Sequence, residues 1–542
     1  MTMIESGHID SFTRDHLPPM EQWPEFRFDQ EDLAYPERLN AAGVLLDGAV
    51  ANGYGDKTAI ITPSRRISYR DLLEQANRIA NYLTRELGIV PGNRVLLHGF
   101  NSIELSAAWF AVIKTGAVAV TTMPMLRAAE LSKITSKADV DIALCDVGLL
   151  EVVEETATLT GKLRTIAAWG DGGALDRALP EMSTNFVNAD TARDDVALLA
   201  CTSGTTGEPK ACAHFHSAIL AMADTFGRHT LAPEADEIYT GTPPLAFTFG
   251  LGAFLVFPAR FGLTVALPER PGFEALCETI EACKATTVFT APTGYRAMMG
   301  LWQDYDLSSL RKAVSAGEHL PQATSDEFHA RTGLRLIDGI GATEMIHIFI
   351  SASGSLIRPG ATGQAVPGYQ AELLDDAGQP VPEGEIGRLA LKGPTGCLYL
   401  DDERQKTYVQ KGWNLTGDLY RRDAEGYYWY VSRADDLIVS SGYNIAGPEV
   451  EQALLSHDAV AETAVIGEAD QERGAIIKAF VVLAQGWSGN ADLVAELQTH
   501  VKSEIAPYKY PRDIEFIDQL PKTQTGKIQR FKLRREAISL DH

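Results

Sequence analysis

A nine-residue string, TSGTTGEPK, places strong limits on how this chain can fold. It runs from Thr202 to Lys210 and follows an apolar run, Val196 to Ala200, that predicts a buried strand. Its two glycines let backbone N–H groups turn toward one point, while four hydroxyl side chains and one lysine add donors and a positive charge. The string therefore predicts a phosphate-binding loop, with a solvated turn as the alternative. The expected phosphate-binding residues are Thr202, Ser203, Gly204, Thr205, Thr206, Gly207 and Lys210.

The spacing of this loop is not that of a Walker motif, because G-x-x-x-x-G-K-[ST] is absent. The length and charge of the chain exclude further classes. Its 542 residues exceed what one hydrophobic core organises, so two or more domains are expected. The formal charge of −24 argues against general nucleic-acid binding, which requires a basic surface.

No targeting or membrane segment is expected. The N-terminal string MTMIESGHIDSFTRD lacks the apolar core of a signal peptide, and the most apolar stretches, Leu105–Ile113 and Leu251–Pro258, are too short to span a bilayer. The six cysteines show no C-x-x-C pairing and are expected to be reduced thiols. We therefore expect a cytoplasmic protein, monomer or homodimer, with neither nucleic acid nor membrane as a partner.

Helix-like and strand-like segments alternate in the first third of the chain. Helical spacing over Tyr69–Leu87 and Ser102–Thr115 alternates with strand-like runs at Arg94–Leu97 and Ala117–Thr122. The alternation returns between residues 236 and 344. It predicts βαβ units and parallel sheets with helices outside. Later strands are expected at Val288–Ala291 and Leu334–Asp338.

The pattern changes after Ile357 and again near Ser432. Many Gly and Pro between short apolar runs, over residues 358–393, predict a small β subdomain with strands at Gln370–Leu374 and Gly387–Leu391. The last part predicts an α+β unit of about 110 residues. Its helices are expected at Pro448–Leu455 and Ala491–Glu504, and its strands at Ala461–Ile466, Lys478–Leu483 and Ile514–Ile517.

The predicted fold class is therefore α/β with α+β. A large N-terminal body, residues 1–432, would contain two βαβ-type sheet subdomains and the small β subdomain. A hinge, residues 433–436, would join this body to a small mobile α+β domain, residues 437–542.

A second motif, DGIGATE, follows a predicted strand and spans Asp338 to Glu344. Ligands bind at such strand ends in open α/β sheets. Gly339 and Gly341 are expected to let a flat ring approach the backbone, Thr343 to donate to a phosphate, and Glu344 to hold Mg²⁺ through oxygen. The alternative is an ordinary glycine-rich turn.

Two later motifs add candidate ligand contacts. In GDLY, Asp418 is suited to accept hydrogen bonds from ribose hydroxyls, and Arg433 of SRADD to add a contact there. In PKTQTGKIQR, Lys527 is a candidate mobile cation for phosphoryl chemistry, because charge develops there on oxygen atoms. It belongs to a basic segment, Lys509–Arg535, with eight Lys/Arg and three Asp/Glu. Each motif alone also fits a turn, a surface ion pair or a basic loop.

The four motifs occur in this order between Thr202 and Arg530, and together they resemble the adenylate-forming superfamily of acyl-CoA synthetases, luciferases and nonribosomal-peptide adenylation domains. The likeness covers nearly the whole chain. It implies an enzyme that uses ATP, Mg²⁺ and coenzyme A. A carboxylic acid would first form an acyl-AMP with release of pyrophosphate, and the thiol of coenzyme A would then displace AMP.

The same resemblance implies a role for each motif. The implied contacts are Lys210 and its loop with the β- and γ-phosphates, and Ala316, Gly317 and Asp338–Gly341 with adenine. Thr343 and Glu344 would contact the α-phosphate and Mg²⁺, and Asp418 and Arg433 the ribose. Lys527 would contact the substrate carboxylate and the α-phosphate. It also implies a hinge at Asp435 and a thiol tunnel at Ser441, Gly442 and Tyr443. Two residues depart from the family pattern: Ile340 replaces an aromatic residue, and Ser432 replaces a glycine.

The segment PPLAFTFGLGAFLVFP, Pro243–Pro258, resembles the acyl pocket of the benzoate-CoA ligase branch, and in particular of the 2-aminobenzoate-CoA ligases. The strings EMIHIFIS and DSFTRDHLPPMEQWPEF share this resemblance. Phenylalanines offer flat walls, and Gly250 and Gly252 are expected to make room for a ring; a Phe-rich core helix is the alternative. The implied aryl pocket contains Phe247, Thr248, Phe249, Gly250, Phe257, His347 and Ile348.

The predicted function is thus an AMP-forming aryl acid–CoA ligase for 2-aminobenzoate. His347 is expected to orient the aryl acid, with a satisfied core histidine as the alternative. The acceptor for an ortho-amino group would be His347, a backbone carbonyl or the substrate's own carboxylate. Benzoate or another substituted benzoate is an alternative substrate, and a medium-chain fatty acid a further one. A stand-alone enzyme that loads an aryl group onto a carrier protein is an alternative acceptor. A non-catalytic nucleotide sensor is disfavoured, because Lys527 and Glu344 are both present.

Overall fold

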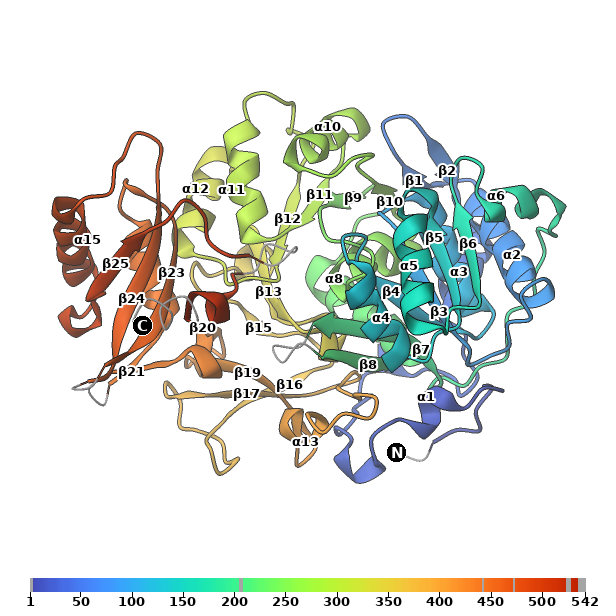
Figure 1. Ribbon diagram of the computed structural model, residues 1–542, viewed down its shortest axis with the longest axis horizontal. Coiled ribbons are helices and arrows are strands. Elements are labelled where there is room, and N and C mark those ends of the chain that lie inside the picture. The colour runs from blue at the N-terminus through green and yellow to red at the C-terminus, as the bar shows by residue number, and fades with distance from the viewer. Residues whose placement is uncertain (1–2, 204–207, 441–442, 471–472, 523–527, 535–542) are drawn as a thin grey trace.

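The computed structural model describes residues 3–203, 208–440, 443–470, 473–522 and 528–534. Figure 1 shows a large body built from the N-terminal three quarters of the chain and a smaller C-terminal unit, coloured orange to red, at its side. The predicted mixture of α/β layers and an α+β C-terminal domain is confirmed.

The first sheet has six strands in the order β6-β5-β3-β4-β7-β8. All neighbours are parallel except β7 and β8, which form an antiparallel pair. The strands are β3 (Arg94–His98), β4 (Val118–Thr122), β5 (Ile142–Asp146), β6 (Thr165–Trp169), β7 (Val196–Ser203) and β8 (Pro209–Phe215). The helices in this part of the chain are α2 (Tyr69–Arg85), α3 (Ile103–Lys114), α4 (Ala128–Lys137), α5 (Leu150–Thr160), α6 (Ala174–Ala178) and α7 (His216–Met222).

The sequence explains where these helices start. Ser68 caps α2 through a capping box, since its hydroxyl accepts from Asp71 N at 3.1 Å and Asp71 accepts from Ser68 N at 3.0 Å. Ser102 caps α3 in the same position, accepting from Leu105 N at 3.0 Å. Every residue of α3 except Glu104 is buried, which explains why its apolar run has no polar face.

The second sheet has nine strands in the order β15-β14-β13-β12-β11-β9-β10-β1-β2, and its central strands are parallel. They are β1 (Thr58–Ile61), β2 (Arg66–Ser68), β9 (Ile238–Gly241), β10 (Thr264–Ala266), β11 (Thr287–Thr290), β12 (Lys312–Ala316), β13 (Leu336–Gly341), β14 (Ile348–Ser351) and β15 (Gln364–Ala365). The helices in this part are α8 (Thr248–Leu251), α9 (Phe257–Phe261), α10 (Phe273–Cys283), α11 (Pro292–Leu301) and α12 (Gln322–Thr332).

A five-stranded antiparallel sheet forms the predicted β subdomain, at the lower edge of the body in Figure 1. Its elements are β16 (Gln370–Leu374), β17 (Ile386–Lys392), α13 (Gln405–Tyr408), β18 (Val409–Gln410), β19 (Trp413–Arg422) and β20 (Tyr428–Arg433). The two strands predicted there, in β16 and β17, are confirmed.

The C-terminal unit has its own hydrophobic core, formed by residues between Ile438 and Leu533. Among the described residues it contains a two-stranded sheet, a three-stranded sheet, the helices α14 and α15 and a short helical segment at residues 530–534. The elements are β21 (Ile438–Ser440), β22 (Tyr443–Ile445), α14 (Gly447–Leu455), β23 (Val460–Asp470), β24 (Gly474–Leu483), α15 (Ala491–Glu504) and β25 (Asp513–Phe516). Helix α14 contacts β20 and α12 of the large body, so the unit sits against the body next to the β subdomain. Within the described part of the chain, every helix is too short or too polar to cross a bilayer.

Candidate active site

The phosphate-loop motif lies on an antiparallel hairpin. Thr202 and Ser203 end β7, and Lys210 lies near the start of β8, with Thr202 paired to Lys210 and Ser203 to Pro209. The predicted donors Gly204, Thr205, Thr206 and Gly207 lie outside the described residues. The hairpin brings the two ends of the motif together without the strand–loop–helix geometry of a Walker loop.

Lys210 and Glu344 come from distant parts of the sequence and meet around Tyr399. Lys210 Nζ lies 4.0 Å from Glu344 Oε1 and donates to the Tyr399 hydroxyl at 3.1 Å. That hydroxyl in turn donates to Glu344 Oε1. Thr343 and Glu344 begin a short 3₁₀ segment, Thr343–Met345, that follows β13. The cluster therefore joins a cation and a carboxylate, as a site for phosphate and a divalent metal requires.

The chemistry of this cluster fits Mg²⁺. The Glu344 side chain is 14% exposed and faces Lys210 at the cluster. In nucleotide sites Mg²⁺ is typically held by one or two carboxylates together with substrate phosphates. Among the described residues, no group of three or more His, Cys, Asp and Glu side chains is arranged to hold a metal alone. Phosphate oxygens would therefore complete the coordination.

The adenine candidates lie at the edge of two paired strands. Ala316 at the end of β12 pairs with Gly339 of β13, and Gly317 follows with a positive φ of 90°. The Asp338 oxygen Oδ1 is buried without a hydrogen-bond partner among the described residues, and burial raises the pKa of Asp338 to about 8. A carboxyl group that keeps its proton can donate one hydrogen bond and accept another, which fits the edge of a purine.

The structure corrects one expectation about DGIGATE, because the strand predicted to end at Asp338 continues to Gly341 as β13. The two glycines of the motif also allow close packing. A Cβ on Gly339 would lie 2.8 Å from the Ile348 side chain, and one on Gly341 would lie 2.9 Å from the carbonyl oxygen of His347. They therefore allow the segment at β14 to pack closely against β13. Between them, Ile340 pairs with Ile350 and occupies the position where the family has an aromatic residue.

The two ribose candidates face each other across adjacent strands. Asp418 of β19 pairs in register with Arg433 of β20, and Arg433 Nη1 donates to Asp418 Oδ1 at 3.1 Å. Asp418 is 8% exposed and lies within a strand, so it is not the turn residue of the alternative interpretation. Nearby, the ring of His319 stacks on Tyr430 with 4.9 Å between centroids. Burial lowers the pKa of His319 to about 4, so this imidazole is neutral.

The predicted aryl pocket is built around His347. The imidazole is 3% exposed, and among the described residues neither ring nitrogen makes a hydrogen bond of ordinary length and angle, although the backbone of Phe249 lies beside the ring. Its ring centroid lies 4.8 Å from that of Phe257, 5.3 Å from that of Phe226 and 5.8 Å from that of Phe249. Burial lowers the pKa of His347 to about 3, so the ring is neutral and carries one donor and one acceptor.

The Phe-rich segment is helical, so it is also the core helix of the alternative interpretation. Helix α8 continues through a π-helical turn, Gly252–Val256, into α9. Thr248 and Phe257 are buried in it, and Phe247 precedes it. The prediction that Gly250 makes room for a ring is wrong, because a Cβ there would lie 2.1 Å from the Pro244 carbonyl oxygen. At Gly252 the space is occupied by His347, 2.6 Å from the Cβ position.

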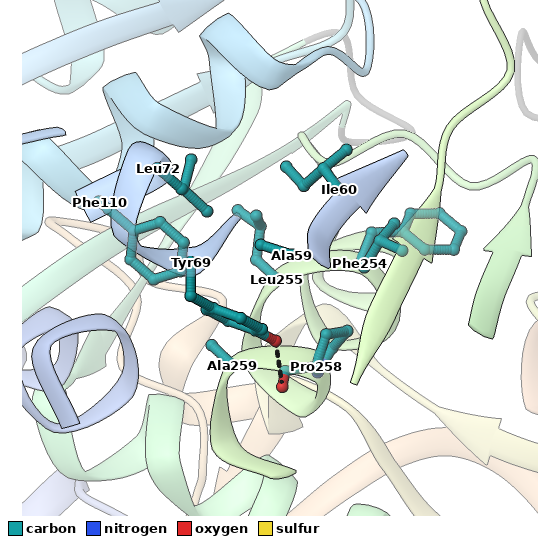
Figure 2. Close-up of a pocket in the computed structure, with 10 residues that line it drawn as sticks. Ala59, Ile60, Tyr69, Leu72, Phe110, Phe254, Leu255, Pro258 and Ala259 are labelled. Carbon is teal, nitrogen blue, oxygen red and sulfur yellow. Dashed lines mark hydrogen bonds between the residues drawn. The ribbon is translucent and has the colours of Figure 1, made fainter. Parts of the chain in front are cut away.

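One small cavity adjoins the Phe-rich segment, and a larger one lies in the β subdomain. The smaller, shown in Figure 2, has a volume of about 10 Å³ and lies beside Tyr69, whose hydroxyl donates to Pro258 O at 2.7 Å. This is room for roughly one water molecule, so it is a packing gap. The larger, of about 250 Å³, lies in the β subdomain beside Arg388 and Trp413.

The C-terminal candidates are only partly described. Lys527, Ser441 and Gly442 lie outside the described residues. Asp435 belongs to a short 3₁₀ segment, Ala434–Asp436, with its Oδ1 3.7 Å from Arg433 Nε. Tyr443 is 55% exposed, and its ring lies 4.6 Å from that of Tyr508 between centroids. The hinge and the thiol tunnel remain predictions.

The basic segment is largely paired within the C-terminal unit. Four of its described cations form ion pairs with carboxylates of residues 436–462. These pairs are Lys509 with Glu449, Lys522 with Glu462, Arg530 with Glu451, and Arg534 with Asp436. For these side chains the structural interpretation of the basic segment is the better one.

Sequence reasoning missed three residues of the site. Tyr399 bridges Lys210 and Glu344, and His319 stacks on Tyr430 beside the adenine and ribose candidates. Nothing local marks these residues as functional. The string GPTGCLYL does not indicate which strand its tyrosine will face. In the folded chain an antiparallel bridge between Cys212 and Tyr399 brings this tyrosine to β8.

Comparison with known proteins agrees with this geometry. The AMP-binding enzyme family matches residues 48–398, and the AMP-binding enzyme C-terminal domain matches residues 449–527. Benzoate–CoA ligase of Thauera aromatica is 35% identical over 514 residues, covering 93% of this chain and 97% of the relative. The 4-hydroxybenzoate–CoA/benzoate–CoA ligase of Rhodopseudomonas palustris is 36% identical over 509 residues, covering 91% and 94%.

Solved structures give the same result. An anthranilate CoA ligase in complex with anthranoyl-AMP superposes with a TM-score of 0.90 at 35% identity, covering 95% of this chain and all of the other. A benzoate CoA ligase from Burkholderia xenovorans LB400 gives a TM-score of 0.84 at 32% identity, covering 92% and 100%. The similarity to these relatives shows that the chain is an AMP-forming acid–thiol ligase. It belongs to the AMP-binding enzyme family, within the adenylate-forming benzoate–CoA ligase branch.

Proposed function

We propose that this protein is a 2-aminobenzoate–CoA ligase that forms an aryl-AMP and pyrophosphate from ATP, and then the aryl-CoA thioester and AMP. The substrate proposal rests mainly on the buried His347, whose ring nitrogens make no hydrogen bond of ordinary length and angle among the described residues, with the backbone of Phe249 beside the ring. Phe226, Phe249 and Phe257 surround it. The high TM-score to an anthranilate CoA ligase supports the same substrate.

The ortho-amino group explains why such an imidazole would be useful. A buried amine without an acceptor costs about 1–3 kcal/mol, and so does a buried imidazole nitrogen without a partner. Because His347 is neutral, one of its nitrogens can accept a hydrogen bond from the amine. Benzoate has no group that would satisfy this nitrogen, so the pocket would favour 2-aminobenzoate.

In the proposed first step, a carboxylate oxygen of the substrate attacks the α-phosphorus of ATP, and the bond to the β-phosphate oxygen breaks. Lys210 and the β7–β8 hairpin would hold the leaving phosphates, and Thr343 would donate to the α-phosphate. Asp338 would bind the purine edge, and Asp418 the ribose hydroxyls. Mg²⁺ held at Glu344 would neutralise charge on the phosphate oxygens. Lys527 would bridge the two reacting groups.

In the proposed second step, the C-terminal unit turns about Asp435, Lys527 leaves, and the segment at Tyr443 lines the entry of the thiol. The sulfur attacks the acyl carbonyl carbon and AMP leaves. Exclusion of water by the closed site would protect the mixed anhydride between the two steps. We place this reaction in the cytoplasm.

A panel of carboxylic acids tests the proposal. Purified enzyme is assayed for CoA-dependent AMP formation with 2-aminobenzoate, benzoate, 2-hydroxybenzoate, 2-fluorobenzoate, 4-hydroxybenzoate and hexanoate. The proposal expects the highest kcat/KM for 2-aminobenzoate. A higher value for benzoate, for another substituted benzoate or for hexanoate would make the corresponding alternative correct. Aryl-AMP formation without any aryl-CoA product would instead favour a carrier-protein acceptor.

The role of His347 is tested separately with His347→Ala. Loss of the imidazole should reduce the preference for 2-aminobenzoate over benzoate by roughly tenfold, because one hydrogen bond in a buried site is lost. An unchanged preference would show that another group accepts the amine.

A further inference from the structure

The hydroxyl of Tyr399 lies between the cation and the carboxylate of the candidate phosphate site. Lys210 Nζ donates to it at 3.1 Å, and it donates to Glu344 Oε1. The direct separation between Lys210 Nζ and Glu344 Oε1 is 4.0 Å. A direct charge-assisted hydrogen bond between these groups would be about 2.7–2.9 Å long. The hydroxyl therefore lies between two opposite charges whose separation is longer than a direct hydrogen bond.

The position of this hydroxyl is fixed by the fold behind it. Tyr399 is 1% exposed, forms an antiparallel bridge with Cys212 of β8, and donates its backbone N–H to Gln405 Oε1 at 2.9 Å. This bridge consists of two backbone hydrogen bonds with β8, from Ala213 N to Leu398 O and from Leu400 N to Ala211 O. The segment is thus attached to the strand that carries Lys210, and the hydroxyl does not depend on the two charges for its place.

The two charged side chains have more freedom than the tyrosine. The Lys210 side chain is 27% exposed and the Glu344 side chain 14% exposed. Opposite charges in a partly desolvated cleft attract each other strongly, so without an intervening group they would close into a direct ion pair. Incoming phosphate and metal would then have to separate that pair before binding.

We propose that Tyr399 is a positioning residue that keeps Lys210 and Glu344 apart in the free enzyme, so that both are open to MgATP. The inference rests on the nucleotide-binding roles proposed above for Lys210 and Glu344. In the free enzyme the Tyr399 hydroxyl occupies the space between Lys210 and Glu344. When MgATP binds, phosphate and metal replace the hydrogen bonds of this hydroxyl.

The variant Tyr399→Phe removes the hydroxyl and keeps the ring, including the contact of Lys210 Nζ over its face at 5.0 Å. Calorimetry measures binding of MgATP and of metal-free ATP to the full-length protein. We expect both dissociation constants to rise about tenfold, because an ion pair must be broken, while the KM for the aryl acid changes less than twofold. Thermal unfolding checks that the variant is folded.

Tyr408→Phe is the matched control. Its ring lies 6.0 Å from that of Tyr399 between centroids, it is half-buried against the same cluster, and its hydroxyl has no hydrogen-bond partner among the described residues. Removing that hydroxyl should leave ATP binding unchanged. An equal loss in Tyr408→Phe would show a general packing effect and overturn the inference.

A double-mutant cycle with Glu344→Gln separates positioning from simple loss of a contact. Without the negative charge no ion pair can form, so Tyr399→Phe in the Glu344→Gln background should change metal-free ATP binding less than twofold. An undiminished tenfold effect in that background, or wild-type affinity in Tyr399→Phe alone, would overturn the inference and leave the proposed function standing. Failure of the wild-type protein to bind MgATP would instead overturn the proposed function, and this inference with it.

Discussion

A methyl group on Gly252 would lie 2.6 Å from Nε2 of His347, a separation that packed atoms do not tolerate. The imidazole has little room to move away, since it is buried against Phe226 and Phe257. The Phe-rich helical segment thus fixes the position of the His347 imidazole, because Gly252 has no side chain and the imidazole packs directly against it.

Gly252→Ala should therefore impair aryl acid binding and spare ATP binding. We expect the KM for 2-aminobenzoate to rise tenfold or more, because the imidazole must shift, and the dissociation constant for ATP to stay within twofold. Steady-state kinetics and calorimetry measure the two. Gly300→Ala in α11 is the control, since nothing lies within 4 Å of its Cβ position. A wild-type KM in Gly252→Ala would show that His347 does not contact the substrate.

Burial of neutral histidines should make the protein sensitive to acid. Burial lowers the pKa of His98 and His319 to about 4 and that of His216 and His347 to about 3. The unfolded chain takes up these protons near pH 6.5, whereas the folded protein does not, so the unfolded state binds more protons below that pH. The contribution of these neutral histidines to the free energy of unfolding is fully present above about pH 6.5 and is lost as the pH falls toward 4 and below.

The contribution of one such histidine can be measured. The free energy of unfolding of the wild-type protein should fall steeply between pH 6.5 and 4.5, and His347→Asn should reduce that fall by about 2–3 kcal/mol. Denaturant titrations at several pH values give both curves. Equal slopes in the wild-type protein and in His347→Asn would contradict the proposed burial effect.

The sequence was sufficient for the regular parts of the fold. Strands β3, β4 and β11 and helices α2, α3 and α15 follow from local apolar spacing and capping, because each buries one face or a whole run along a continuous segment. The same reasoning did not reveal the reason for Gly250, since the Pro244 carbonyl that approaches it comes from a turn whose path is set by packing.

The candidate site was predictable only where one motif carries its own chemistry. Lys210, Glu344, Asp418 and Arg433 stand in recognisable strings. The structure places Asp418 beside Arg433, as expected, and Lys210 Nζ 4.0 Å from Glu344 Oε1. Tyr399 and the His319–Tyr430 stack depend on strands that meet across long stretches of sequence. No local pattern encodes such a meeting, so these contacts could not be predicted.

The pair of Asp418 and Arg433 allows a test that combines a variant with a modified ligand. Asp418→Asn should weaken ATP binding about tenfold, because a charge-assisted hydrogen bond to the ribose is worth about 1.5–3 kcal/mol. The wild-type protein should lose a similar factor with 2′-deoxy- or 3′-deoxy-ATP, whichever hydroxyl Asp418 contacts. In Asp418→Asn that deoxy compound should bind as well as ATP. Asp376→Asn, an exposed acid of the same subdomain, is the control. Additive losses would place Asp418 away from the ribose.

Loss of Lys527 should affect the two half-reactions differently. If it bridges the substrate carboxylate and the α-phosphate, Lys527→Ala should reduce aryl acid-dependent ATP–pyrophosphate exchange by 10³-fold or so, on the scale of a lost transition-state contact. Conversion of supplied aryl-AMP and CoA to aryl-CoA should fall less than fivefold, because the lysine has left the site in that step. Lys532→Ala, an exposed lysine of the same basic segment, controls for loss of charge and should retain both activities. Equal losses in the two half-reactions of Lys527→Ala would show that the lysine serves both steps, and the proposed exchange of Lys527 for the thiol would then be wrong.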